Sequence, residues 1–238
     1  MTDTDKVPVH VGFILDGNRR WAVAEGLPTL EGHKQGYENL KTISAHAFKK
    51  GVQYVSAFVF STENWKRSEE EVTYLMNLVL WMAKHKVKEL DKQNIKVQFL
   101  GEREKLTPAV LAAMQNVEKR TEKNTGGTLI LCLNYGGQQE VVGAVNALLT
   151  EQPGRTSITL KDIEAHLYHP EVPPLDLIIR TSGEQRLSNF MLWRAAYSEL
   201  YFIDKHWPAL STDDFDEALA VYASRERRFG GDHKSAKA

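Results

Sequence analysis

The sequence contains one cysteine in 238 residues, so no disulfide can form within the chain. Cys132 lies inside the apolar run 128–133, and we expect it to be a buried core residue rather than a reactive thiol. Positive and negative charges nearly cancel, with 30 Lys and Arg against 31 Asp and Glu. A general nucleic-acid-binding protein normally carries a basic excess, so we expect no nucleic-acid partner.

Long apolar runs are also absent, because no stretch approaches the ~18 residues that a membrane-spanning helix needs. Residues 1–8 are polar and acidic, unlike a signal peptide, and are expected to be a flexible leader. No repeat or linker interrupts residues 9–231, which predicts one domain followed by a disordered tail at 232–238. Together these features predict a cytoplasmic protein.

The most informative stretch is Val9–Ala22, which reads VHVGFILDGNRRWA. A short apolar run, typical of a buried strand, is followed by a carboxylate, a glycine, an amide and two arginines at positions 16–20. Paired guanidinium groups suit phosphate, and a carboxylate can hold a divalent metal ion. A plain strand-to-helix turn would explain Asp-Gly-Asn alone, so the prediction needs further support.

That support comes from two later strands that end in similar polar clusters. The apolar run 51–60 leads into Ser-Thr-Glu-Asn-Trp and then Arg67, and the run 175–179 leads into Arg-Thr-Ser-Gly-Glu-Gln-Arg. In a parallel sheet all three clusters would lie along the edge at which α/β proteins bind their ligands.

The alternation of strands and helices predicts the fold class. We expect an α/β domain with a mostly parallel central sheet of about six strands and helices on both faces. The sequence lacks the Gly-x-Gly-x-x-Gly, Walker and Gly-x-Ser-x-Gly motifs, so mononucleotide binding and acyl transfer are not indicated. The remaining strands are expected at 95–100, 128–134 and 198–203, and the helices at 32–50, 69–90, 107 onward, 140–149, 160–167 and 212–222.

The predicted helix 69–90 is apolar on two faces. Ser68 and Glu71 have the spacing of a capping box at its start. A helix with two apolar faces needs two partners, of which one is the core. The second could be a lipid-like ligand in a tunnel or a subunit interface, and a wide core contact explains the pattern equally well.

Seven blocks of the sequence resemble the cis-prenyltransferase family, and most closely its bacterial undecaprenyl diphosphate synthases. They extend from about His10 to Gly231 in the family's order, and this ordered series is more specific than any single motif. The blocks are ILDGNRRWA, GHKQG, FVFSTENWKR, LNYGGQQE, IIRTSGEQRLSNFMLW, YSELYF and RERRFGG.

The resemblance implies a homodimeric enzyme that depends on Mg²⁺. Such an enzyme adds isopentenyl diphosphate units to farnesyl diphosphate with new cis double bonds, and the long-chain product serves as a cell-wall lipid carrier. It also implies a parallel-sheet core beside an apolar tunnel, with at most peripheral membrane contact when the product leaves.

The resemblance also assigns roles to individual residues. Asp16 would be the essential carboxylate, Asn64 the proton-removing residue, and Asp16 and Glu199 the metal ligands. The allylic diphosphate would be surrounded by Gly17, Asn18, Arg19, Arg20 and His33, with Trp21 bordering the substrate. The second substrate would be held by Ser61, Thr62, Glu63, Trp65, Arg67, Arg180, Arg186, Ser188 and, from the other subunit, Arg228.

Three positions depart from the family pattern. Thr29 replaces an arginine that contacts phosphate in several members, so that contact is either missing or supplied by Arg19. Gln185 replaces a metal-binding histidine of some members, and Val59 replaces a smaller tunnel residue, which affects product length. An amide hardly accepts a proton, so Asn64 is better suited to orienting a water molecule or a diphosphate.

Two alternatives to a long-chain synthase remain. One is a short-chain cis-prenyltransferase that stops after one or a few additions. The other is a non-catalytic partner subunit, although a scaffold has no chemical need for Asp16, Arg20, Asn64, Arg180 and Arg186.

Overall fold

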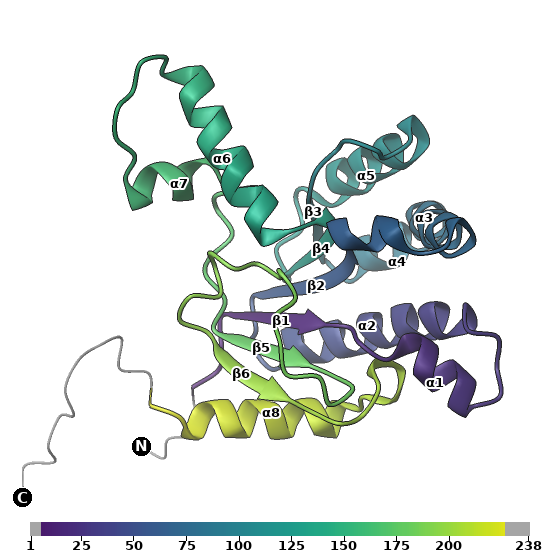
Figure 1. The fold of residues 1–238 in the computed structure, drawn as a ribbon. Helices are drawn as coiled ribbons and strands as arrows, with labels where there is room; N and C mark the ends of the chain where they lie inside the picture. Colours follow the sequence, from purple (N-terminus) through teal and green to yellow (C-terminus); the bar gives the residue numbers. More distant parts are fainter. Residues whose placement is uncertain (1–5, 227–238) are drawn as a thin grey trace, which may run out of the picture.

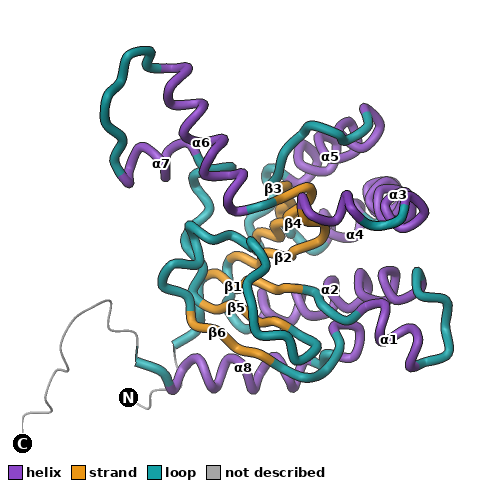
Figure 2. Tube along the Cα trace, in the orientation of Figure 1, coloured by secondary structure: helices purple, strands orange, loops and turns teal. Residues whose placement is uncertain are grey.

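The centre of the fold is a sheet of six parallel strands (Figures 1 and 2). The computed structural model describes residues 6–226. Each neighbouring pair of strands in the order β3-β4-β2-β1-β5-β6 is parallel. The strands are β1 (His10–Ile14), β2 (Tyr54–Ser61), β3 (Lys96–Leu100), β4 (Thr128–Tyr135), β5 (Leu177–Arg180) and β6 (Glu199–Phe202).

Helices connect the strands except β5 and β6, and several begin at a side-chain cap. The hydroxyls of Ser68, Thr107, Thr159 and Ser211 each accept a hydrogen bond from a backbone N–H in the first turn. The helices are α1 (Asn18–Ala24), α2 (Glu31–Lys49), α3 (Glu69–His85), α4 (Val87–Lys92), α5 (Pro108–Thr121), α6 (Gly137–Glu151), α7 (Leu160–His166) and α8 (Thr212–Ser224), with short 3₁₀ helices η2 (Thr62–Lys66) and η3 (Trp207–Ala209).

The single-domain α/β prediction is confirmed, with two differences in its elements. The sequence did not predict α1, and the expected helix 69–90 is two helices that meet at Lys86. Of the residues described, no helix is long and apolar enough to cross a membrane.

The two faces of the sheet are covered differently. One face, with Phe13, Val55 and Leu131, packs against α2, α3, α4, α5 and α8 in the main core. The other face, with Ile130 and Cys132, is covered chiefly by the chain that precedes and follows β5. The prediction of helices on both faces was therefore too simple. Figure 1 shows α6 and α7 packed together and projecting from the sheet.

The strand order brings the three polar clusters together. β1 lies between β2 and β5, and all three run in the same direction. Their carboxyl ends, and the residues that follow, therefore lie at neighbouring positions on one edge. The chain leaves β1 for β2 on one side and later returns to β5 on the other, which is the topology that opens a ligand-binding crevice.

His10, at the start of β1, is a buried group whose titration affects stability. Its Nδ1 lies 2.8 Å from the carbonyl oxygen of Pro173, and its Nε2 lies 2.7 Å from Ser56 Oγ. A carbonyl only accepts, so Nδ1 carries the proton and Nε2 accepts from the Ser56 hydroxyl. Burial lowers the pKa of His10 from 6.5 to about 4, so the ring is neutral at pH 7.

We expect acid to destabilise the fold through this residue. The unfolded histidine titrates near 6.5 and the folded one near 4, so its contribution is lost as the pH falls through this range. The loss should reach about 3 kcal/mol by pH 4, at about 1.4 kcal/mol for each pH unit. Denaturant unfolding of the wild type and His10→Asn at neutral and acidic pH measures it. Equal pH dependence in the two proteins would contradict the prediction.

Candidate active site

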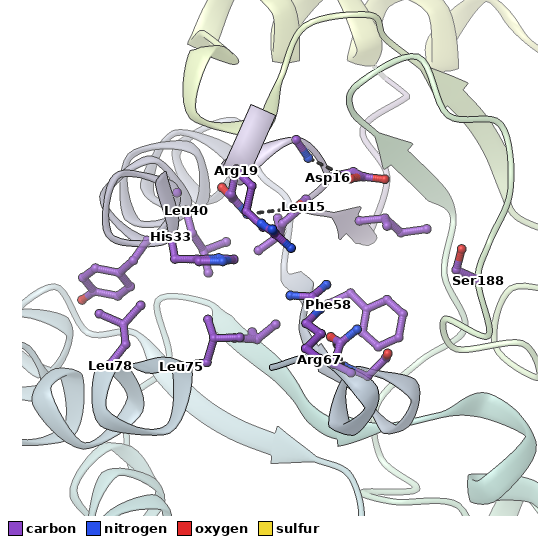
Figure 3. Close-up of a pocket in the computed structure, with 18 of the residues that line it drawn as sticks. Leu15, Asp16, Arg19, His33, Leu40, Phe58, Arg67, Leu75, Leu78 and Ser188 are labelled. Carbon is purple, nitrogen blue, oxygen red and sulfur yellow. Dashed lines mark hydrogen bonds between the residues drawn. The ribbon is translucent and has the colours of Figure 1, made fainter. Parts of the chain in front are cut away.

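The residues that follow β1, β2 and β5 line one cavity of about 1050 Å³. Asp16, Arg19, Arg67 and Ser188 contribute its polar part. In Figure 3, Leu40 from α2 faces Leu75 and Leu78 from α3 beside these polar groups. A charged region and an apolar region therefore share one continuous space.

Asp16 is the acidic centre of the polar part. Its Oδ2 accepts a hydrogen bond from Arg180 Nη2 at 2.9 Å, and its Oδ1 accepts from Gly17 N at 2.8 Å and Arg20 Nη2 at 3.2 Å. The backbone is also fixed, because the carbonyl of Asp16 accepts from Thr181 Oγ1 and Trp207 N. The carboxylate is thus held at the end of β1.

The charge state of Asp16 follows from these contacts. Partial burial raises the pKa of its carboxyl group, but the hydrogen bond and charge of Arg180, together with Arg20 and the Gly17 N–H, outweigh that effect. The net pKa lies below the ordinary value, so Asp16 is a carboxylate at neutral pH.

Arg180 at the end of β5 is the most buried cation of the site, with a side chain 4% exposed. Besides Asp16 it donates to Ser188 Oγ at 2.8 Å and to the carbonyl oxygen of Arg186. Its Nε is buried and has no hydrogen-bond partner among the described residues. A buried donor without a partner is unusual in a native protein.

Three glycines explain how the chain can pack around Asn18. Gly17 has a φ of 97°, in the left-handed region that favours glycine. A Cβ atom at Gly32 would lie 2.0 Å from the Asn18 carbonyl oxygen, and one at Gly36 would lie 2.2 Å from Asn18 Oδ1. The Gly-x-x-x-Gly spacing at the start of α2 therefore lets α2 and α1 meet beside the Asp16 loop.

The side of the cavity between α1, α2 and α3 is cationic. Arg19, His33 and Arg67 all line the cavity, and each also contacts Glu71 on α3. Burial lowers the pKa of His33, while Glu71 offsets part of that effect, so the ring is neutral at pH 7. The two arginines therefore carry the positive charge of this wall.

Asn64 lies in a capping box at the start of η2. Its Oδ1 accepts a hydrogen bond from Ser61 N at 3.0 Å, and the Ser61 side chain accepts from Asn64 N. One lone pair of its oxygen is engaged in this way, and its Nδ2 group supplies two donors that suit a ligand oxygen. This geometry agrees with a role in orienting a substrate rather than accepting a proton.

The apolar wall includes two consecutive residues of β2. Phe58 and Val59 both line the cavity, although alternation along a regular strand would send them to opposite faces. The register of β2 against β4 shifts between Phe58 and Phe60, so Val59 occupies an irregularity in the strand. A bulge of this kind redirects side chains at a functional site.

The sequence matches the family model described as "Putative undecaprenyl diphosphate synthase" over residues 14–230. The chain belongs to this prenyltransferase family. The cis-prenyltransferase resemblance and the prediction of an enzyme are thereby confirmed, and the chain is a prenyl-transferring enzyme of a family that uses allylic and isopentenyl diphosphates.

Individual relatives support the same assignment. An "Isoprenyl transferase" of Thermotoga maritima is 45% identical over 228 residues, which cover 95% of this chain and 98% of the relative. Lavandulyl diphosphate synthase from Lavandula x intermedia, solved with dimethylallyl diphosphate, has a TM-score of 0.86 at 34% identity and covers 94% of this chain and 98% of its own. A "probable undecaprenyl diphosphate synthase" from Campylobacter jejuni has a TM-score of 0.81 at 25% identity, over 94% of this chain and 99% of its own.

Most of the residues assigned by the prenyltransferase resemblance line the cavity. Of those that do not, Trp65 donates its indole N–H to Asn134 Oδ1 at 2.7 Å and packs on Phe60, which are structural contacts. Arg186 contributes its carbonyl to Arg180, while its guanidinium lies on the exposed surface against Glu184. The residues that line the cavity are Asp16, Gly17, Asn18, Arg19, Arg20, His33, Ser61, Glu63, Asn64, Arg67, Arg180 and Ser188; Trp21, Thr62, Trp65, Arg186 and Glu199 do not.

Glu199 and Asp16 are not brought together within one chain. Glu199 begins β6 and pairs with Leu177 at the start of β5, whereas Asp16 contacts Arg180 at the end of β5. Three residues of strand separate these rows, roughly 10 Å. The Glu199 carboxylate instead accepts from Arg225 Nη1 at 2.9 Å. The predicted Arg228 lies outside the described residues.

The residues of the cavity could hold Mg²⁺ together with substrate phosphates and water, but not as a site made of protein groups alone. Of the residues in the described part of the chain, no three acidic, histidine or cysteine side chains form a cluster that could hold a metal ion. Mg²⁺ is commonly held by one or two carboxylates together with substrate phosphates and water. Asp16, ionised and in the lining of the cavity beside arginines, fits that second arrangement.

Sequence reasoning missed three residues of the site. Asn189 lines the cavity and donates from Nδ2 to Glu63 Oε1 at 3.1 Å. Tyr37 of α2 lines the apolar region, and Glu71 contacts three groups of the cationic wall. The contacts of Glu71 with Arg19 and His33 and of Asn189 with Glu63 join parts of the chain that are distant in sequence, so no local pattern indicates them.

Proposed function

We propose that this prenyltransferase extends farnesyl diphosphate with successive isopentenyl diphosphate units, each adding a cis double bond. The proposed product is a long-chain polyprenyl diphosphate, undecaprenyl diphosphate, for use as a cell-wall lipid carrier. The observation that carries the proposal is the cavity that joins a cationic region to an apolar one. An amphiphilic substrate needs both, since its diphosphate binds charged donors and its chain binds apolar walls.

The allylic diphosphate is assigned to the Asp16 side of the cavity. Arg19 and His33 offer donors on this side of the cavity. Arg67, which the resemblance assigned to the second substrate, is assigned to the allylic diphosphate instead, because it shares Glu71 with Arg19 and His33. Mg²⁺, held by Asp16 and phosphate oxygens, would supply positive charge for the departing diphosphate. The arginines stabilise the same developing charge and, being fixed before the reaction, need little reorganisation.

Isopentenyl diphosphate is assigned to the β5 side of the cavity. Arg180 donates to Ser188 Oγ at 2.8 Å, and both residues line the cavity. Binding here would place the alkene against the allylic carbon, which is a contribution of position rather than of chemistry. Asn64 Nδ2 is available to orient the group that accepts the proton lost from isopentenyl diphosphate.

The reaction then follows from the positions of the two substrates. The allylic carbon–oxygen bond breaks, and its electrons leave with the diphosphate. The isopentenyl alkene forms the new carbon–carbon bond, and loss of one proton restores a double bond in the longer allylic diphosphate. The growing chain extends along Leu75, Leu78 and Met82 of α3.

A short-chain synthase is the second candidate. It stays open because this chain has the same fold as lavandulyl diphosphate synthase, at a TM-score of 0.86, and the fold alone does not set product length. A non-catalytic partner subunit is less well supported. Asp16, Arg180 and Ser188 form a connected polar group in the cavity lining, and a scaffold would not need this group.

One incubation distinguishes these possibilities. Purified protein is mixed with farnesyl diphosphate, labelled isopentenyl diphosphate and Mg²⁺, and the products are separated by chain length. We expect a ladder that ends at a long-chain product. Products that stop after one or a few additions support the short-chain synthase, and absence of incorporation contradicts both enzymes.

The assembly is also a proposal. We propose a homodimer in the cytoplasm, with peripheral membrane contact only when the product is released. The Arg-x-Gly segment that contains Arg228 resembles one that reaches the isopentenyl diphosphate site of the other subunit in the family, and this resemblance supports the proposal.

A mixing experiment tests the shared site. Asp16→Ala and Arg228→Ala, each inactive alone, are combined under subunit exchange. With random pairing of equal amounts, about half of the symmetric dimers are mixed and one site in each is intact, so about a quarter of the sites should recover. If exchange is verified and no activity returns, each Arg228 serves its own chain.

A further inference from the structure

Glu71, in the first turn of α3, is a buried carboxylate at the meeting point of four segments. Its Oε1 accepts from Arg67 Nη1 at 2.9 Å and lies 3.2 Å from His33 Nε2, and its Oε2 accepts from Arg19 Nη1 at 3.2 Å. The Glu71 side chain is 8% exposed. It therefore connects α3 with α1, with α2 and with the chain that follows η2.

This arrangement differs from the capping box that the sequence predicts. The backbone half is formed, because Glu71 N donates to Ser68 Oγ at 3.3 Å. The carboxylate, which would complete the box, instead contacts the three groups of the cationic wall. All three line the cavity, whereas Glu71 does not, so the carboxylate lies behind the groups that face a ligand.

The geometry points to Glu71 as a positioning residue for the allylic diphosphate, one that fixes Arg19, His33 and Arg67 in the orientation that receives it. This inference rests on the proposed function. Each arginine gives one N–H to Glu71 in the contacts described, and a guanidinium has five, so donors remain for phosphate oxygens. Holding long side chains in place before binding removes an entropy cost that binding would otherwise carry.

Glu71 could instead weaken diphosphate binding by competing for the arginines. The two roles predict opposite changes in affinity when its charge is removed. If Glu71 merely neutralised the arginines, it would compete with the diphosphate, and removing its charge would tighten binding. If it positions them, the isosteric Glu71→Gln must weaken binding, because its amide nitrogen cannot accept from the donors it faces. The direction of the change in affinity therefore decides between positioning and competition.

The experiment measures farnesyl diphosphate binding without isopentenyl diphosphate, followed by steady-state kinetics. For Glu71→Gln we expect the Kd and KM for farnesyl diphosphate to rise about tenfold or more, as loss of one to two charge-assisted hydrogen bonds implies. The KM for isopentenyl diphosphate should change far less, because Arg180 and Ser188 do not contact Glu71. Glu70→Gln, an exposed neighbour on the same turn, is the matched control and should resemble the wild type.

Two further measurements keep the outcome decisive. Glu71→Asp keeps the charge but shortens the reach by one methylene, so it should also raise the Kd even if Glu71→Gln proves too unstable to purify. In combination with Arg67→Ala, the effect of Glu71→Gln should be smaller than in the wild type, since part of the effect of Glu71 acts through Arg67.

An unchanged or lower Kd in folded Glu71 variants would overturn the inference and leave the proposed function intact. Equal rises in both substrate KM values would also overturn it, because they would indicate a general structural effect. Wild-type protein that binds no farnesyl diphosphate would overturn the proposed function, and this inference with it.

Discussion

Asp16→Asn is expected to lower prenyl transfer by about a thousandfold or more while leaving the fold intact. The carboxylate lies at the end of β1 with both oxygens facing cationic or backbone donors, and its lowered pKa keeps it ionised. The amide has the same shape and can still accept from Arg180. It cannot supply the negative charge that Mg²⁺ requires.

The measurement combines turnover with thermal unfolding. Chelation of Mg²⁺ in the wild type should reproduce the loss, and added Mg²⁺ should restore activity. Asp216→Asn is a matched control, because Asp216 pairs with His46 and Lys50 between α8 and α2, away from the cavity. That control should stay within about twofold of the wild type, since an exposed pair contributes little. Folded Asp16→Asn with more than about a tenth of wild-type turnover would refute the role.

Asp16→Ala adds a structural comparison. It removes the oxygen that accepts from Arg180, a guanidinium only 4% exposed. Removing one partner of a buried ion pair leaves an uncompensated charge, so the alanine variant should be less stable than the asparagine variant. If the alanine and asparagine variants differ in stability but have the same residual turnover, the hydrogen bond to Arg180 serves stability and the negative charge serves catalysis.

The common edge of the site was predictable because it depends on few assumptions. Apolar runs before Asp16, Ser61 and Arg180 predict strands, and parallel strands must end on the same edge. The prediction did not need the strand order, although the order brings the three ends closer by making β2, β1 and β5 neighbours. From the sequence, the glycines at 32 and 36 could be recognised only as part of a motif. Their role is to leave room for Asn18, which packs against them from a different part of the chain.

Other features depend on contacts that no local pattern records. Glu71 matched a capping box, yet its carboxylate contacts Arg19 and His33, which are 52 and 38 residues away. The break between α3 and α4 falls at Lys86, where no glycine or proline indicates it. Glu199 matched a metal-ligand position, but register pairs it with Leu177, at the edge of the sheet opposite to Asp16.

The length of the product is expected to follow from the side chains that line the apolar part of the cavity. Val59 and Met82 both line it, one from β2 and the other from α3. A close-packed wall cannot take extra volume without strain, so Val59→Phe and Met82→Trp should exclude part of the growing chain. The first condensation should stay within about threefold of the wild type, because the substitutions leave the proposed diphosphate donors Arg19, Arg67 and Arg180 unchanged.

The two substitutions should also differ from each other in a definite direction. Val59 precedes Ser61 by two residues of strand, roughly 7 Å from the polar cluster. Met82 follows Glu71 by eleven residues of α3, roughly 16 Å along the helix. Val59→Phe should therefore give shorter products than Met82→Trp. Val9→Phe adds the same volume as Val59→Phe at an exposed position before β1 and should leave the ladder unchanged. Unaltered products from both cavity variants would place the chain elsewhere, and the reverse order of lengths would mean that it does not run along α3 from Glu71 toward Met82.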